Sequence, residues 1–166
     1  MRVLVVYDSV FGNTELVAQA VGKALGSPVD VAVVRVNDVK LEQLAGLQLL
    51  IVGSPTRGFR PTEAIADFLK RIPADGIRGV PVAAFDTRLS TSDIESSALR
   101  LLVKTGGYAA KPIADRLKKK GGEVIIPPEG FLVSGEKGPL KEGELERAAL
   151  WAKRITESRD FGSRHS

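Results

Sequence analysis

Short apolar runs alternate about five times along this chain with segments whose apolar residues recur every three or four positions. The first run, Val3 to Tyr7, is continuous, which is typical of a strand buried on both faces of a parallel sheet. The helical spacing that follows it ends at Gly26. The sequence contains no repeat, linker or low-complexity segment. Such alternation predicts an α/β domain whose parallel sheet has helices on both faces.

The remaining elements follow from the same two spacings. Further strands are expected at Val29–Val36, Leu47–Val52 and Val80–Phe85, and a fifth at Glu123–Ile126 and Phe131–Val133 with an interruption at Pro127-Pro128. A short helix or turn is expected at Leu41 and Leu44, and helices at Ile65–Ile72, around Leu99–Val103, up to about Lys120 with Pro112 in the first turn, and along Leu145, Ala148, Ala149, Ala152 and Ile155. Residues 1–158 then form one domain, and residues 159–166 a flexible tail.

Cysteine and histidine are the residues whose scarcity excludes most chemistry. The chain has no cysteine, which rules out disulfides, thiolate metal sites and a cysteine nucleophile within it. The one histidine, His165, lies in the polar tail, so neither a Ser-His-Asp triad nor a histidine-rich metal site is expected. Redox chemistry in this protein would have to come from a bound cofactor.

The formal charge of +4 leaves two interpretations open. Nucleic-acid binding is one, but the basic residues are scattered and aromatic residues make up only 5% of the chain. A solvated surface with a mild positive bias is the other, and we favour it. No apolar run approaches the ~20 residues that a membrane helix needs, and the first strand begins too early for a signal peptide. We therefore expect a cytoplasmic protein.

The loop after the first strand carries the strongest functional signal. Ligands of parallel α/β sheets bind beyond the carboxyl ends of the strands. Here Asp8–Thr14 opens directly into a helix, and its hydroxyls, side-chain amide and exposed N–H groups suit a phosphate dianion. Gly12 would let the backbone approach the anion closely. The alternative is an ordinary helix start, with Asn13 or Thr14 as the N-cap residue.

Other phosphate-binding loops fit less well. No G-x-G-x-x-G follows any predicted strand, so the dinucleotide-binding fingerprint is missing. Gly53 to Gly58 has the glycine spacing of a P-loop, but Phe59 and Arg60 stand where Lys and Ser or Thr belong. Hydrolysis of ATP or GTP is therefore not supported.

Two segments at predicted strand ends resemble the flavin loops of the flavodoxin family. Tyr7–Glu15 is similar to the family's FMN phosphate loop, especially in the flavodoxin domains of flavodiiron proteins, and Gly53–Phe59 is similar to its second flavin loop. The resemblance covers nearly the whole chain. It implies a three-layer flavodoxin-like fold with a five-stranded parallel sheet of order 2-1-3-4-5 and one bound FMN.

The resemblance also implies which residues bind the cofactor. The phosphate loop would comprise Ser9, Val10, Phe11, Gly12, Asn13 and Thr14. The isoalloxazine ring would lie against Pro55, Thr56, Arg57, Gly58 and Phe59, with Phe59 either stacking on the ring or packing against protein. Asp86, Thr87 and Arg88 follow the fourth predicted strand, where the family has its third flavin loop. No catalytic side chain and no metal ligand is expected.

Three features depart from the family pattern. Phe11 replaces the central hydroxyl residue of the phosphate loop, and the segment from Asp86 to Ser92 has no tyrosine to cover the outer face of the flavin. The chain also lacks the strongly acidic character of many flavodoxins. Arg57, Arg60 and Arg88 could lie near the flavin, so we expect a second-electron potential less negative than in acidic flavodoxins, unless all three point to solvent.

Three functions remain open on the sequence alone. The first is an electron carrier that passes electrons between a reductase and an acceptor. The second is an NAD(P)H-dependent reductase of quinones or small molecules, favoured by the uncovered third loop. The third is a flavodoxin-like interaction domain without a cofactor, because the fold alone does not establish FMN binding.

Overall fold

A computed structural model describes residues 2–27, 30–90 and 107–158. The helix expected around Leu99–Val103 and the tail expected from residue 159 lie outside the described residues. The strands are β1 (Val3–Tyr7), β2 (Val31–Arg35), β3 (Leu49–Pro55), β4 (Pro81–Leu89), β5 (Glu123–Val124) and β6 (Glu129–Val133). The helices are α1 (Asn13–Leu25), α2 (Glu63–Arg71), α4 (Ala110–Lys119) and α5 (Glu144–Ser158), with short 3₁₀ helices η1 (Val36–Asp38) and η2 (Leu41–Leu44).

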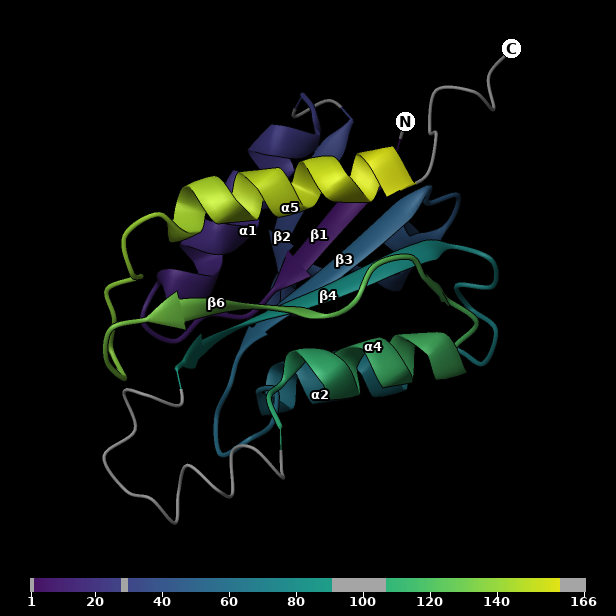
Figure 1. Ribbon diagram of the computed structural model, residues 1–166. Coiled ribbons are helices and arrows are strands. Elements are labelled where there is room, and N and C mark those ends of the chain that lie inside the picture. The colour runs from purple at the N-terminus through teal and green to yellow at the C-terminus, as the bar shows by residue number, and fades with distance from the viewer. Residues whose placement is uncertain (1, 28–29, 91–106, 159–166) are drawn as a thin grey trace.

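The sheet has the strand order that the sequence predicts. All its pairings are parallel, and the strands run β2-β1-β3-β4-β5 (Figure 1). The expected fifth strand consists of two strands on one edge: β5 pairs with Pro81 and Val82 at the start of β4, and β6 pairs with its second half, from Phe85 to Leu89. The break coincides with Pro127-Pro128, which have no N–H to donate to the sheet. The flavodoxin-like α/β architecture is confirmed.

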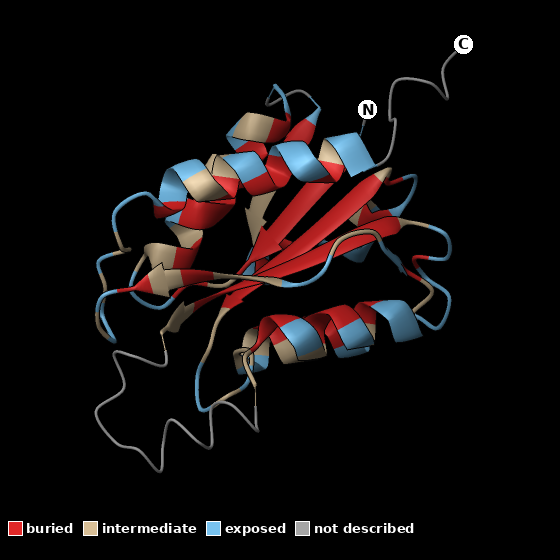
Figure 2. Ribbon diagram, viewed as in Figure 1, coloured by how far each residue is buried: buried red, intermediate tan, exposed pale blue. Residues whose placement is uncertain are grey.

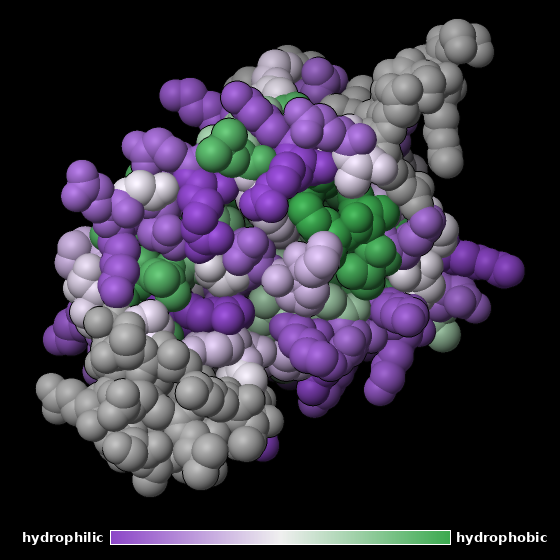
Figure 3. Space-filling view, in the orientation of Figure 1, coloured by the Kyte–Doolittle hydropathy of each residue, from purple (hydrophilic) through white to green (hydrophobic). Residues whose placement is uncertain are grey.

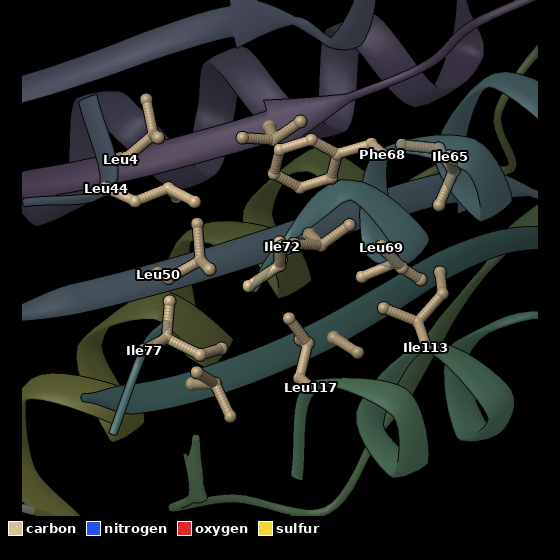
Figure 4. Packing of buried hydrophobic residues seen from close by; sticks show 14 of the residues in the cluster. Leu4, Leu44, Leu50, Ile65, Phe68, Leu69, Ile72, Ile77, Ile113 and Leu117 are labelled. Atoms are coloured by element: carbon tan, nitrogen blue, oxygen red, sulfur yellow. The ribbon is translucent and has the colours of Figure 1, made fainter. Parts of the chain in front are cut away.

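Strand residues alternate between two hydrophobic cores, one on each face of the sheet. Leu4, Leu50 and Val82 face α2 and α4, where they pack with residues such as Phe68 and Leu117 (Figure 4). The neighbouring strand positions face α1 and α5 and form the second core. Figure 2 shows the central strands as buried over most of their length, with half-buried residues at the carboxyl ends of β3 and β4. This double burial explains why the strands read as continuous apolar runs.

The helices follow the predicted pattern, with an error of phase in the last one. In α5, Ala148, Ala152 and Ile155 are buried as expected, but Leu145 is 39% exposed. Trp151, which the predicted apolar face omitted, is buried and meets Phe85 and Phe131 edge-to-face. None of the helices in the described ranges is long and apolar enough to span a bilayer.

Candidate functional site

One cavity of about 240 Å³ lies at the carboxyl ends of the central strands. Its walls come from the loop after β1, the end of β3 with the loop that follows, the end of β4, and the segments before α4 and after β6. The lining residues are Ser9, Val10, Phe11, Asn13, Thr14, Pro55, Thr56, Arg57, Gly58, Phe59, Thr87, Arg88, Leu89, Tyr108, Val133 and Glu136. The structure thus brings together most of the residues that the sequence selects.

The loop after β1 is held in shape by its own polar groups. The Ser9 hydroxyl oxygen accepts the N–H of Gly12 at 3.1 Å and that of Glu15 at 3.3 Å. Asp8 accepts the N–H of Ser9 at 2.9 Å, which fixes the start of the loop. Gly12 has a φ of 94°, in the left-handed region that favours glycine. Gly12 therefore shapes the loop without lining the cavity.

The start of α1 has backbone N–H groups without a protein acceptor among the described residues. Within the described residues, no protein acceptor satisfies the first-turn N–H groups of Asn13 and Thr14, as is usual for a helix start. The N-cap residue is Gly12, which has no side chain, so the N-cap alternative for Asn13 and Thr14 is wrong. Free N–H groups at the positive end of a helix, on a cavity wall, are suited to bind an anion.

A hydroxyl pair joins the first and third segments of the site. Thr14 Oγ1 lies 2.8 Å from Thr87 Oγ1, and both side chains are buried. Asn13 Nδ2 donates to the carbonyl of Lys137 at 3.3 Å, across the segment after β6. These contacts fix the helix start relative to β4 and so define one wall of the cavity.

The second segment contains a tight turn. Arg57 and Arg60 exchange backbone hydrogen bonds of 2.8 and 3.1 Å, and the two residues between them, Gly58 and Phe59, have φ values of 54° and 68°. Positive φ at both central residues is the pattern of a type I′ turn. For Phe59 this conformation costs roughly 1–2 kcal/mol. Backbone strain of this kind is often found at functional sites, and here it places Phe59 on the cavity wall.

Asp86, Thr87 and Arg88 do not form the loop that the sequence predicts. They belong to β4, because pairing with β6 extends this strand to Leu89. Thr87 and Arg88 line the cavity, whereas Asp86 lies behind the wall and is fully buried. Asp86 therefore supports the site from behind and does not line it.

Asp86 and Arg88 form a buried ion pair, and an aromatic ring packs against its guanidinium. Both carboxylate oxygens of Asp86 accept from the Arg88 guanidinium at 2.7 Å, and one also accepts the N–H of Ala110 at 2.9 Å. Burial raises the pKa of Asp86, while Arg88 and the Ala110 N–H oppose that shift. The Arg88 guanidinium lies 3.7 Å from the centroid of the Tyr108 ring, within the range of a cation–π contact.

Tyr108 is the site residue that the sequence analysis missed. The segment from Asp86 to Ser92, where a covering aromatic residue was expected, has none, whereas Tyr108 lies just before α4 and reaches the cavity from there. Its hydroxyl donates to the carbonyl of Leu89 at 3.4 Å. An aromatic residue immediately before the next predicted helix was the signal that could have identified it. Leu89, Val133 and Glu136 were missed as well, since none has a motif.

The three arginines expected near the site take different positions. Arg57 and Arg88 line the cavity, and Arg60 does not. The Arg57 guanidinium lies 5.6 Å from the Phe11 ring centroid and 3.9 Å from the Glu136 carboxylate. Phe11 is 41% exposed, so it adds apolar surface to the rim where the family has a hydroxyl.

Comparison with known proteins gives consistent matches. A family model described as Flavodoxin matches residues 5–151. A flavodoxin from the domain Archaea is 25% identical, with a TM-score of 0.72 over 95% of this chain and 97% of that one. Flavodoxin 2 from Bacillus cereus is 21% identical, with a TM-score of 0.74 over 96% and 100% of the two chains. Rubredoxin oxygen:oxidoreductase from Desulfovibrio gigas is 19% identical, with a TM-score of 0.69 over 95% of this chain and 35% of that one. No curated protein sequence matches.

Proposed function

This chain belongs to the flavodoxin family, and from that premise we propose that it binds one FMN in the described cavity and carries electrons between redox partners. The observation that carries the proposal is the start of α1. There, Asn13 and Thr14, whose N–H groups have no acceptor among the described residues, line a cavity whose other walls are largely apolar. That combination suits a ligand with a phosphate at one end and a flat ring at the other.

The residues present fit the two ends of FMN. Ser9, Val10, Phe11, Asn13 and Thr14 would surround the phosphate, with Gly12 setting the shape of the loop. Pro55, Thr56, Arg57, Gly58 and Phe59 would lie along the ring, with Thr87, Arg88 and Tyr108 across from them. Phe11 donates no side-chain hydrogen bond, so the remaining donors are the backbone, Ser9, Asn13 and Thr14.

When bound, FMN supplies reversible electron transfer, and the protein supplies binding, orientation and electrostatics. Thr14 and Thr87 hold the two walls of the cavity together. Asp86 binds two nitrogens of Arg88 and so fixes the position of the guanidinium at the cavity wall. A carrier needs no general acid or base, in agreement with a chain that has no cysteine and a single histidine at position 165.

The reductase alternative depended on an uncovered third wall. Tyr108 lies at that wall with its ring against Arg88, which removes the observation that favoured direct use of NAD(P)H. We therefore favour the carrier. Rapid bleaching of the bound flavin by NADPH alone would reverse that preference.

The visible absorption spectrum of the purified protein tests the proposal, before and after incubation with FMN and removal of free flavin. We expect a retained flavin spectrum. Thr14→Val should weaken FMN binding about tenfold, the loss of one or two hydrogen bonds of about 0.5–1.5 kcal/mol each. Thr156→Val makes the same substitution on α5, away from the cavity, and should leave affinity unchanged. Protein that takes up no FMN would overturn the proposal.

A further inference from the structure

A second hollow, of about 470 Å³, adjoins the proposed flavin cavity and has no proposed role in FMN binding. It lies between α4 and the β5–β6 edge of the sheet, and we call it the α4–β5 groove. Arg88 and Tyr108 line both hollows, so these two side chains form the wall between them. A molecule seated in the groove would therefore contact the same tyrosine that lines the flavin cavity.

The groove combines an apolar floor with a basic rim. Ala114 of α4 and Val124 and Pro128 of the sheet edge form the floor. Lys111 and Lys118 stand on the rim, two helical turns apart on one face of α4, and Asp115 lies between them as the one acidic residue of the lining. Figure 3 shows green apolar surface along the edge segment, between the purple surfaces of α5 and α4.

The positive charge of the rim is only partly neutralised. Lys111 pairs with Asp115 at 3.2 Å, but both side chains are more than half exposed, so this pair contributes little. Lys118 has no ion pair within the described residues, and the exposed Lys119 continues the charge along the chain. A surface of this kind attracts acidic partners over roughly a Debye length, about 8 Å at physiological salt.

The sheet edge also limits how a partner can bind. An exposed edge strand can add a strand from another chain, but Pro127 and Pro128 interrupt this edge and donate no hydrogen bonds. A second copy of this chain is disfavoured as well, because its net charge is +4. The remaining occupant is a different protein that offers acidic and apolar side chains.

We infer that the α4–β5 groove is the docking surface for an acidic redox partner, which is brought there against the Tyr108–Arg88 wall of the flavin cavity. The inference rests on the proposed electron-carrier function and specifies the chemistry of its partner. The lysines of the rim steer and orient the partner, and the floor of Ala114, Val124 and Pro128 supplies apolar contact. Reduced FMN would then pass one electron to the oxidised metal centre of an acceptor, which gains that electron without a change in its bonds.

Stopped-flow oxidation of the FMN-loaded, photoreduced protein tests the inference. Acidic plastocyanin, with Cu(II), and basic cytochrome c, with Fe(III), are the acceptors. We expect plastocyanin to react faster at low ionic strength and the advantage to vanish at high salt. The double variant Lys111→Glu with Lys118→Glu should lower the plastocyanin rate constant at least tenfold without slowing cytochrome c. Lys153→Glu with Arg154→Glu, an equal change of charge on α5, should lower it less than twofold.

A binding measurement that needs no electron transfer separates this inference from the proposed function. Redox-inert cadmium plastocyanin is titrated into ¹⁵N-labelled protein, and we expect amide shifts concentrated between Lys111 and Lys118. Shifts spread elsewhere, or equal effects of the groove and α5 variants, would overturn the inference. Shifts caused there by NADP⁺ but not by plastocyanin would also overturn it, in favour of a small anion. Absence of bound FMN would overturn the proposed function, while this titration still decides what the groove binds.

Discussion

Two clusters, each made of an arginine and the carboxylates that it binds, lie beside Gly130 and hold different parts of the molecule. In the first, Arg88 binds Asp86 and packs so tightly on Gly130 that an added Cβ would lie 2.1 Å from Arg88 Nε. In the second, Arg147 donates to the carbonyl of Gly130 and pairs with Glu144 at 2.8 Å and Glu129 at 3.1 Å. We call them the Asp86 cluster and the Glu144 cluster.

The two clusters differ in what they hold in place. The Asp86 cluster joins β4 to the start of α4 and ends on Tyr108, at the cavity wall. The Glu144 cluster joins β6 to the start of α5, where the Glu144 carboxylate also accepts the N–H of Leu132 at 2.7 Å. The first cluster faces the proposed ligand and the second only the scaffold. A buried ion pair is therefore not in itself evidence for a functional site.

Folding shifts the pKa values of their carboxylates in opposite directions. Burial dominates at Asp86 and raises its pKa. Hydrogen bonds from Arg147 dominate at Glu144 and lower its pKa below the ordinary 4.5. The difference follows from exposure, because Asp86 is completely buried whereas the Glu144 cluster lies closer to the surface.

The largest expected effect comes from breaking the Asp86 cluster. Asp86→Ala leaves the Arg88 guanidinium and the Ala110 N–H without their acceptor, and should lower the free energy of unfolding by about 3–5 kcal/mol. Urea denaturation measures this loss, and Asp115→Ala, an exposed pair on α4, is the control at under about 0.5 kcal/mol. Equal losses in the two variants would show that the cluster contributes no more stability than an exposed ion pair.

Breaking the Glu144 cluster should cost stability and leave FMN affinity unchanged. Glu144→Gln weakens hydrogen bonds to a charged group, worth about 1.5–3 kcal/mol at neutral pH. Because the pKa of Glu144 is lowered by folding, this contribution is complete above pH 4.5 and is lost as the pH falls through the folded value. The stability difference between wild type and Glu144→Gln should therefore stay constant from pH 7 to about the unfolded value of 4.5 and shrink as the pH falls further. A difference that grows on acidification, or a change in FMN affinity, would contradict the assignment.

The sequence predicted the elements whose signals are local and missed those that depend on distant pairing. The loop from Ser9 to Thr14 was identified because a strand end and a helix start are adjacent in the chain. Asp86 to Arg88 looked like a loop because the apolar run ends at Phe85, whereas pairing with β3 extends the strand to Thr87 and pairing with β6, about forty residues later, extends it to Leu89. Tyr108 was missed for the same reason, because its place beside Arg88 depends on how α4 packs against β4.

Tyr108 is the aromatic member of the Asp86 cluster at the cavity wall. Tyr108→Ala removes a ring from the cavity wall and should weaken FMN binding about tenfold, equivalent to about 1.4 kcal/mol. Tyr108→Phe keeps the ring and loses only the bond to Leu89, so its effect should stay within about threefold. Fluorescence titration of the apoprotein with FMN measures both. Equal losses would mean that the hydroxyl, and not the ring, contacts the ligand.

The smallest expected effect comes from removing the charge of Arg57, which is held more loosely at the cavity wall than Arg88. Arg88 is held by a buried carboxylate, whereas Arg57 is 44% exposed and lies 3.9 Å from an exposed Glu136. Both line the proposed cavity, and a cation near FMN favours its reduced, more negative form. Arg57→Gln should therefore make the second-electron potential more negative by about 20–40 mV, which corresponds to about 0.5–1 kcal/mol for one electron at an exposed site.

The matched control for Arg57 is its partner in the turn. Arg60→Gln removes the same charge from the same turn, but Arg60 does not line the cavity, so its shift should stay below about 10 mV. A spectroscopic potentiometric titration measures both variants against wild type. Equal shifts for Arg57→Gln and Arg60→Gln would show that only the net charge of this face matters. A shift confined to Arg57→Gln would show that a cation acts on the flavin from the cavity wall even without a buried carboxylate to hold it.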